Sequence, residues 1–299
     1  MRLFLLTLFC LTLFASNSIF CRAALVTWGM EPLQYTAVRS LSAAAMLALM
    51  CLTRVVKPLE GGDSVWKQAW EQSSWAGTFY LFAYMICFSL AYVDMPSAAG
   101  TLIINTSIQF GMVGWAMVQG EFPSRRQTAG LVIAFAGLAA LLSPGLTAPP
   151  LFSSFLMVVV GLVWSGYTLC GRAAQSGPLA AAGNFFRCAI GGAAVACLAF
   201  ILEGTAHPMA YVCAVAAGAV ATALSYTLWY AVSSRYELVG LSIIQLSVPF
   251  ITAFLAVLIL GEPVTLRLVL CSIPILGGIC LALLAKKSGA GRSACPEQH

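Results

Sequence analysis

Twelve residues in long apolar stretches have side chains suited to binding a small amphipathic solute. Amides and tyrosine hydroxyls can hydrogen-bond the polar end of such a solute, and aromatic rings can stack on its apolar body. Polar side chains inside an apolar helix are costly unless they face a partner or a cavity. We therefore predict a substrate-binding site formed by Asn17, Tyr80, Tyr84, Asn105, Gln109, Trp164, Tyr167, Tyr226, Trp229, Tyr230, Gln245 and Pro249.

The spacing of three pairs supports this prediction. Residues four positions apart share one face of a helix. This spacing joins Tyr80 with Tyr84, Tyr226 with Tyr230, and Asn105 with Gln109. Two alternatives stay open. Tyrosines near helix ends often anchor a membrane interface. Amides often form a hydrogen bond with a neighbouring membrane helix, which stabilises the helix pair by roughly 0.6 to 2 kcal/mol.

The residue types that carry catalytic or metal chemistry are poorly placed for it. The eleven cysteines stand mostly alone in apolar runs, no C-x-x-C pair occurs, and the two histidines are far apart. This spacing favours small buried hydrophobes over disulfides or a metal site. Phosphate-binding and dinucleotide motifs are absent from the sequence. We expect no catalytic residue, no cofactor, no metal and no pumping driven by ATP.

The composition predicts that the solvent of this chain is lipid. The 299 residues are 61% hydrophobic and 8% charged, whereas soluble domains carry roughly a quarter charged residues. The net charge of +5 is spread along the chain and forms no basic stripe interleaved with aromatics. The expected partners are therefore a lipid bilayer and a small-molecule substrate, with no nucleic acid.

The apolar runs predict an all-α, polytopic membrane protein with ten transmembrane helices. The first run resembles a secretory signal, but it continues through Val26 and is long enough to span a bilayer uncleaved. The other runs lie at about 33–56, 75–92, 97–119, 128–146, 151–174, 179–202, 209–233, 238–260 and 266–285. They lack the alternation of barrel strands, so helices are expected.

Loop charges predict that both termini are cytoplasmic. With the N-terminus inside, the inner segments carry Arg2, Arg54, Lys57, Lys67, Arg125, Arg126, Arg172, Arg235, Lys286, Lys287 and Arg292. The outer ends carry only Arg22 and Arg267. This asymmetry follows the positive-inside rule, and we expect an integral protein of a bacterial inner membrane.

An internal repeat divides the chain into two halves. At an offset of 141 residues, Gly120-Glu121 falls on Gly261-Glu262 and Gly137 falls on Gly278. A breaker cluster at 147–150 marks the boundary, giving one half at 1–147, a second at 148–287 and a polar tail at 288–299. Because five spans is an odd number, the second half must be inverted. Inverted repeats around a midplane site are typical of secondary transporters.

The ordered duplication resembles the drug/metabolite transporter superfamily, EamA-type branch. The residues that carry the resemblance are the small-polar first helix of each half, Arg39 and Arg187, the turns Gly120-Glu121 and Gly261-Glu262-Pro263, and Pro249; Ile108 departs from the pattern in the first half. The resemblance implies ten spans, transport of small metabolites, often export of amino acids or related compounds, and a central substrate cavity built from both halves.

The roles of two arginines and two glutamates stay open. Arg39 and Arg187 lie inside spans, and we favour structural contacts with helix ends or lipid phosphate, with a carboxylate of the substrate as the alternative. Glu121 and Glu262 at the hinge turns are expected to cap the helices that follow them, with gating or proton coupling as the alternative.

Three classes of function remain, led by a secondary transporter that exports a small metabolite by alternating access. No Asp or Glu falls in the middle of a span, which favours a facilitator or exchanger over proton coupling. An intramembrane enzyme and a structural or assembly protein are the alternatives. The sequence leaves a homodimer, the substrate and the coupling ion open.

Overall fold

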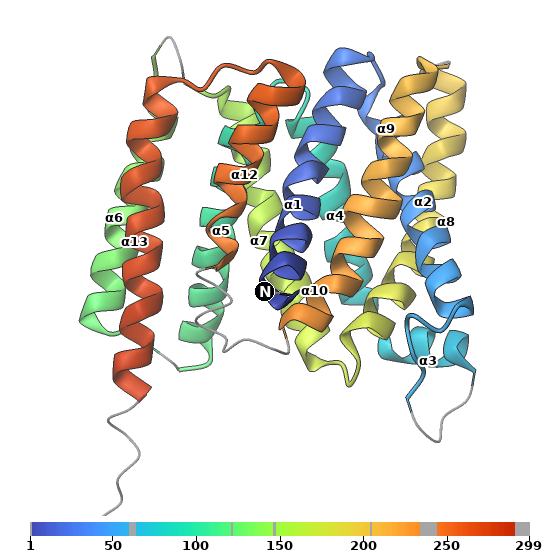
Figure 1. Cartoon of the computed structure of the whole chain (residues 1–299), viewed down its shortest axis with the longest axis horizontal. Coiled ribbons are helices and arrows are strands. Elements are labelled where there is room, and N and C mark those ends of the chain that lie inside the picture. Colours follow the sequence, from blue (N-terminus) through green and yellow to red (C-terminus); the bar gives the residue numbers. More distant parts are fainter. Residues whose placement is uncertain are drawn as a thin grey trace, which may run out of the picture.

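The structure is a computed structural model that describes residues 2–59, 64–120, 122–145, 148–203, 205–233 and 244–290. Every regular element in these ranges is a helix. The long helices stand side by side in one bundle (Figure 1). The expectation of an all-α fold is confirmed.

The elements follow one another in chain order. They are α1 (Arg2–Arg22), η1 (Ala23–Thr27), α2 (Pro32–Leu52), α3 (Val65–Gln72), α4 (Trp75–Ala91), α5 (Ser97–Val118), α6 (Arg125–Leu142), α7 (Leu151–Ala173), α8 (Gly177–Glu203), α9 (Pro208–Gly218), η2 (Ala219–Leu224), α10 (Ser225–Ser233), α12 (Val248–Leu255), η3 (Ala256–Leu260) and α13 (Leu266–Ala290). The three η segments are π-helical.

The chain is a multi-pass α-helical membrane protein. In the described ranges, eight helices are long and apolar enough to cross a bilayer. A ninth candidate is the pair α3 and α4, which are bent by 82° at their junction. Val248–Leu260 is a shorter apolar helix, and the predicted ninth span begins outside the described residues. The count of ten therefore stays a prediction.

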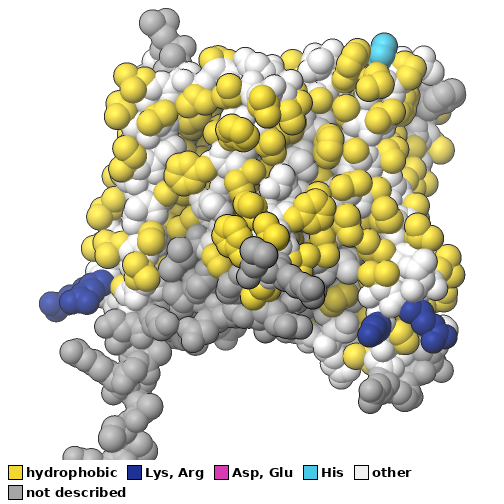
Figure 2. All heavy atoms as spheres, viewed as in Figure 1, with side chains coloured by type: hydrophobic (Ala, Val, Ile, Leu, Met, Phe, Trp, Pro, Cys, Tyr) yellow, Lys and Arg dark blue, Asp and Glu magenta, His cyan; other side chains and the backbone are white. Residues whose placement is uncertain are grey.

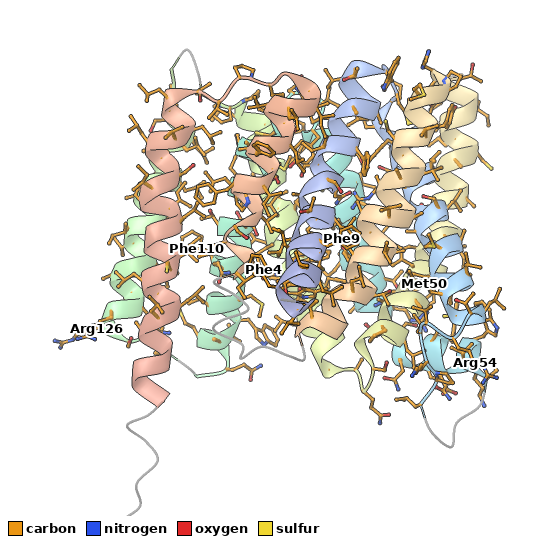
Figure 3. All side chains as sticks on the ribbon, viewed as in Figure 1. Phe4, Phe9, Met50, Arg54, Phe110 and Arg126 are labelled. Carbon is orange, nitrogen blue, oxygen red and sulfur yellow. The ribbon has the colours of Figure 1, made fainter. Side chains whose placement is uncertain are left out.

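The surface agrees with a lipid environment. Hydrophobic side chains cover the face shown in Figure 2, and the Lys and Arg side chains visible there lie at its lower edge. Arg54 and Arg126 mark this same end of the bundle in Figure 3. An exposed apolar surface of this extent is what a bilayer covers. The gathering of cations at one end is the pattern on which the predicted orientation depends.

The helices pack in pairs that the sequence repeat makes equivalent. α2 packs on α8, α6 packs on α13, and α5 packs on α12. The packing of α4 on α7 is matched by the packing of α1 on α9, η2 and α10. The boundary between the halves stays a prediction, but each of these contacts joins one predicted half to the other.

Two glycines allow α8 and α9 to approach α2 closely. A Cβ atom at Gly192 of α8 would lie 2.2 Å from the Ser40 hydroxyl of α2. A Cβ atom at Gly218 of α9 would lie 2.3 Å from the carbonyl oxygen of Arg39. Backbones approach this closely in membranes only at small residues. Helices α8 and α9 therefore both approach α2 closely at Arg39 and Ser40.

Candidate functional site

Six aromatic rings meet where helices of both predicted halves pack together. The ring centroids of Trp164 lie 4.9 Å from Tyr84, 5.4 Å from Tyr167 and 5.3 Å from Tyr226. Phe14 continues the group, 6.0 Å from Tyr226 and 5.6 Å from Trp229. We call these six residues the central aromatic cluster. It draws on α1, α4, α7 and α10.

A polar chain runs along one side of the cluster. The amide nitrogen of Asn17 lies 3.4 Å from the Tyr84 hydroxyl, and Nη2 of Arg39 lies 3.5 Å from the same oxygen. The Oδ1 atom of Asn17 is buried without a hydrogen-bond partner in the part of the chain that the structure describes. The site therefore offers an unused acceptor beside stacked rings.

The structure brings together half of the residues predicted from sequence. Asn17, Tyr84, Trp164, Tyr167, Tyr226 and Trp229 contact one another directly or through the cluster. Phe14, which contacts both Tyr226 and Trp229, is not among the residues predicted from sequence. Its signal was weak, because phenylalanine is common throughout such helices.

The other predicted residues are not seen in the cluster. The ring of Tyr80 packs against α7, where it occupies the space beside Gly166. Asn105 donates to the Thr101 carbonyl of its own helix at 2.8 Å, and Gln109 is half-buried on α5. Their roles in substrate binding stay predictions.

The last three predicted residues are Tyr230 of the eighth predicted span, and Gln245 and Pro249 of the ninth. Pro249 is buried in the first turn of α12, and a turn at residues 246–247 precedes that helix. Gln245 is half-buried just before the turn. The turn therefore ends directly before the helix that carries Pro249. The side chain of Tyr230 lies outside the described residues.

Arg39 is fully buried beside the central aromatic cluster. Its guanidinium carbon lies 5.3 Å from the ring centroid of Tyr84 and 4.8 Å from that of Phe88. Its side chain is 0% exposed. The preferred expectation of a helix-end or lipid contact does not describe this environment, because the head group faces aromatic rings.

Arg187, the equivalent residue of the second half, does contact a helix end. Its Nη2 donates to the carbonyl oxygen of Trp70 in α3 at 3.0 Å. Its guanidinium carbon lies 4.4 Å from the Trp70 ring centroid and 4.8 Å from that of Trp75. These contacts fit the expected structural role.

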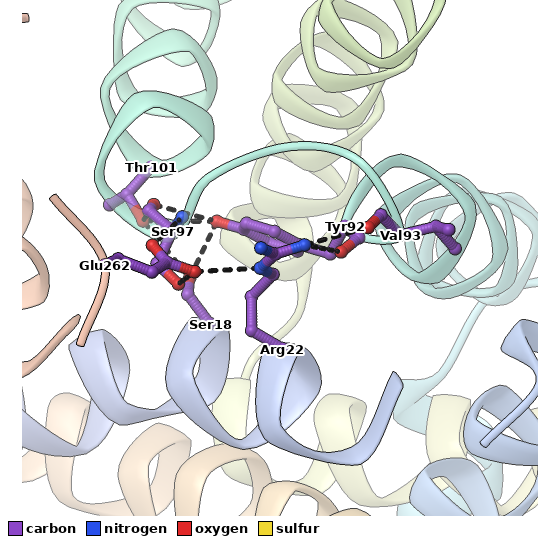
Figure 4. Close-up of polar contacts among 7 residues, drawn as sticks. All are labelled: Ser18, Arg22, Tyr92, Val93, Ser97, Thr101 and Glu262. Carbon is purple, nitrogen blue, oxygen red and sulfur yellow. Dashed lines mark hydrogen bonds and ion pairs between the residues drawn. The ribbon is translucent and has the colours of Figure 1, made fainter. Parts of the chain in front are cut away.

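A second polar site closes one end of the bundle (Figure 4). Arg22 pairs with Glu262 at 2.8 Å, and the two side chains are 15% and 13% exposed. Glu262 also accepts from the backbone nitrogen of Ser97 at 2.8 Å and from its hydroxyl at 3.2 Å. Arg22 donates further to the carbonyl oxygens of Tyr92 and Val93. We call this group the Arg22–Glu262 network.

Hydroxyl groups extend the network inward from Ser97. Tyr92 donates to Ser18 at 2.8 Å, and its hydroxyl lies 3.2 Å from that of Thr101. The hydroxyls of Ser18 and Thr101 are 3.1 Å apart. These buried groups tie α1 to the start of α5, so the network is a continuous polar layer and not a single ion pair.

The expected role of Glu262 is corrected in one respect. Glu262 caps a helix, but that helix is α5 and not the following α13. The Thr265 hydroxyl accepts from the backbone nitrogen of Leu268 at the start of α13. The left-handed conformation of Gly261 (φ +66°) ends the ninth span just before Glu262. Glu121, the counterpart in the first half, lies outside the described residues.

The described residues contain no group of three or more His, Cys, Asp or Glu side chains that could hold a metal. The central aromatic cluster offers a surface for stacking. Beside it lie the Oδ1 acceptor of Asn17 and the buried guanidinium of Arg39. This arrangement can bind a flat apolar body together with a polar group.

Comparisons with known proteins give one family model, two relatives and one solved structure. The EamA-like transporter family model matches residues 151–284, inside the predicted second half. An uncharacterized protein of Pseudomonas aeruginosa is 36% identical over 297 residues, covering 97% of this chain and 98% of that protein. An uncharacterized transporter of Archaeoglobus fulgidus is 32% identical over 100 residues, covering 32% of this chain and 33% of that protein. A crystal structure with 18% sequence identity has a TM-score of 0.61 over 96% of this chain and 98% of its own, which is a likeness of fold alone.

Proposed function

Because this chain belongs to the EamA-like transporter family, we propose that it is a secondary transporter that moves a small amphipathic metabolite by alternating access. The observation that carries this proposal is the central aromatic cluster. It combines Tyr84 from the first predicted half with Trp164 and Tyr226 from the second. A site shared between two halves changes shape when one half rocks against the other.

The Arg22–Glu262 network supports a gate at the outer end of this site. It joins Arg22 of α1 and Ser97 of α5, in the first half, to Glu262 of the turn before α13, in the second half. Rocking the halves apart at this end would separate the pair. The proposed orientation, with both termini cytoplasmic in a bacterial inner membrane, puts this gate on the outer face.

Direction and energetics are further parts of this proposal. We propose export, through a facilitator or exchanger mechanism. Of the carboxylates with described side chains, Glu31, Asp94 and Glu262 lie between membrane spans, and Glu71 is exposed in the last turn of α3, beside the bend that precedes α4. The bilayer and the solute are the proposed partners, and a homodimer stays open.

The test is a flux assay with the purified full chain in liposomes. The panel contains amino acids, nucleosides and cationic drugs. We expect flux of at least one solute class, and loss of most of that flux in Trp164→Ala. The matched control is Trp115→Ala, because Trp115 on α5 is 47% exposed and is not one of the six residues of the central aromatic cluster. It is expected to keep the activity of the wild type.

Two outcomes would overturn the proposal. One is a folded chain that moves no solute of the panel, which would favour the structural or enzymatic alternative. The other is flux that Trp164→Ala and Trp115→Ala reduce equally, which would mean that the central aromatic cluster is not the site.

A further inference from the structure

We propose that Arg39 binds the anionic group of the transported solute beside the central aromatic cluster, and that this group is a carboxylate. We call Arg39 and the cluster together the central site. This inference rests on the proposed transport function and goes further by naming the charge of the substrate. The contact it assigns is a paired hydrogen bond between the guanidinium of Arg39 and the carboxylate, with the apolar body of the solute against the aromatic cluster.

The hydrogen-bond inventory of Arg39 is the first argument. A guanidinium carries five N–H donors. In the structure Nη2 reaches only the Tyr84 hydroxyl, at 3.5 Å, which is long for a hydrogen bond. The Nε and Nη1 atoms are buried with no partner among the described residues. Burying a charged group without partners is strongly unfavourable, so a ligand that supplies acceptors has a large effect here.

The charges around Arg39 are the second argument. The ionisable side chains that act on it are Tyr35, Tyr84 and Tyr226, together with Cys21. None of these side chains is a carboxylate. Among the described residues, none forms a salt bridge with Arg39. The rings of Tyr84 and Phe88 stabilise the cation by cation–π contact, but of the two residues only the Tyr84 hydroxyl accepts from the guanidinium, at 3.5 Å.

The position of Arg39 favours a solute over a lipid headgroup. Arg39 is the eighth residue of α2, which places its Cα about 10 Å along the helix from Pro32. Its side chain is packed between helices and not exposed at the bundle surface. Gly218 of α9 lies against its backbone carbonyl. A phospholipid would need to leave the interface to reach this depth, whereas a small solute in the central site would not.

The neighbouring groups describe the rest of the solute. The Tyr84 hydroxyl lies between Arg39 and Asn17, and the Tyr84 ring stacks near Trp164. A guanidinium fork matches the two oxygens of a carboxylate. The free Oδ1 of Asn17 accepts a donor. The geometry fits an organic acid with a flat apolar body and one hydrogen-bond donor.

The test measures the preference for charge in the wild-type full chain in detergent. Isothermal titration compares 3-phenylpropionate, indole-3-acetate and octanoate with their uncharged amides, and adds phenyl phosphate as a second anion. We expect at least one carboxylate to bind about tenfold to a hundredfold more tightly than its amide, which is the range of a charged hydrogen bond. If no acid binds more tightly than its amide, the proposal is wrong. Tighter binding of phenyl phosphate than of every carboxylate would overturn the assignment of a carboxylate.

Variants assign the preference to a residue. Arg39→Gln is expected to abolish it, and Arg39→Lys to keep only part of it because an ammonium cannot bind two oxygens in a fork. The matched control is Arg187→Gln, which removes the equivalent arginine at a site where Trp70 already supplies an acceptor. A preference that survives in Arg39→Gln would overturn the proposal. The wild-type comparison stands even if Arg39→Gln does not fold.

Failure of this inference is distinguishable from failure of the transport proposal. In liposomes, a folded chain that moves no solute at all overturns transport. A chain that moves neutral or cationic solutes equally well in the wild type and in Arg39→Gln, and binds no acid more tightly than its amide, overturns only the role of Arg39.

Discussion

Arg39 and Arg187 occupy equivalent places in the two halves of the sequence, yet the structure surrounds them differently. Both lie in the second long helix of their half and both lie over two aromatic rings. Arg187 also donates to the Trp70 carbonyl near the end of α3. Arg39 has no comparable acceptor among the described residues.

The difference comes from the loops and not from the arginines. The segment between α2 and α4 is long enough to form the short helix α3, which packs on α8 and supplies the carbonyl for Arg187. The equivalent segment between α8 and α9 runs only from Glu203 to Pro208, too short for a helix that could reach α2. The first half therefore keeps a guanidinium whose Nε and Nη1 atoms have no partner among the described residues.

Arg22 provides the third case, in which an arginine has a carboxylate partner. Arg22→Met is expected to lower the stability of the protein by about 3 kcal/mol, because it leaves the charge of Glu262 partly buried and unpaired. Thermal and SDS denaturation in micelles measure this loss. Opening of this end of the bundle would also increase maleimide labelling of Cys21, which is buried one residue before Arg22.

The control for this prediction is the exposed pair Lys67–Glu71, whose charged atoms are 3.9 Å apart. Lys67→Met is expected to change stability by at most about 0.5 kcal/mol, because surface pairs contribute little. If both variants lost the same stability, the Arg22–Glu262 network would be an ordinary surface contact and not a gate.

Arg187→Met is expected to have the next largest effect, a loss of about 2 kcal/mol. It removes the hydrogen bond to Trp70 and two cation–π contacts. The same denaturation assays measure it, with the exposed Arg126→Met on α6 as the control. A loss no greater than that of Arg126→Met would remove the structural role of Arg187 and, with it, the contrast with Arg39.

Much of this picture could be predicted from sequence, because it depends on local pattern. Apolar runs and breakers located the spans, and the rarity of polar residues in them pointed to Asn17, Tyr84 and Trp164. The helix rotations could not be predicted, since helices that are apolar on all sides do not reveal which face is buried. The ring of Tyr80 accordingly packs beside Gly166 of α7, and the side chain of Asn105 bonds to a carbonyl oxygen of its own helix.

The polar contacts between distant segments could not be predicted from one sequence. Glu262 and Ser97 are 165 positions apart, and nothing local indicates that the acid caps α5 in preference to α13. Arg39 keeps donors without partners among the described residues because the segment between α8 and α9 is too short to supply an acceptor. A useful signal was present, however: an arginine deep in an apolar run without a nearby acid in its own half.

Arg39→Met is expected to change stability in the opposite direction, by a gain of about 1 kcal/mol. Replacing a buried charge that lacks partners by an apolar side chain is often stabilising, and the unbranched methionine can occupy the space of the arginine stem between Tyr84 and Phe88. The denaturation midpoint measures the gain, and flux in liposomes should fall at the same time. Residues kept for function at the expense of stability show this combination. A clear loss of stability would indicate that Arg39 is a structural residue like Arg187.

Tyr84→Phe is expected to have the smallest effect, a loss of stability of at most about 1 kcal/mol. The hydroxyl contacts Asn17 and Arg39 only at 3.4 and 3.5 Å, so its bonds are weak and their loss costs little. If Tyr84 positions the guanidinium for a carboxylate, affinity for the solute should still fall by about fivefold, which corresponds to one neutral hydrogen bond. Tyr92→Phe is the matched control, because that buried hydroxyl bonds Ser18 in the Arg22–Glu262 network instead. It should lower stability and leave affinity unchanged. The reverse result would place the solute nearer the Arg22–Glu262 network than the central aromatic cluster. Arg39 would then have no binding role that distinguishes it from Arg187.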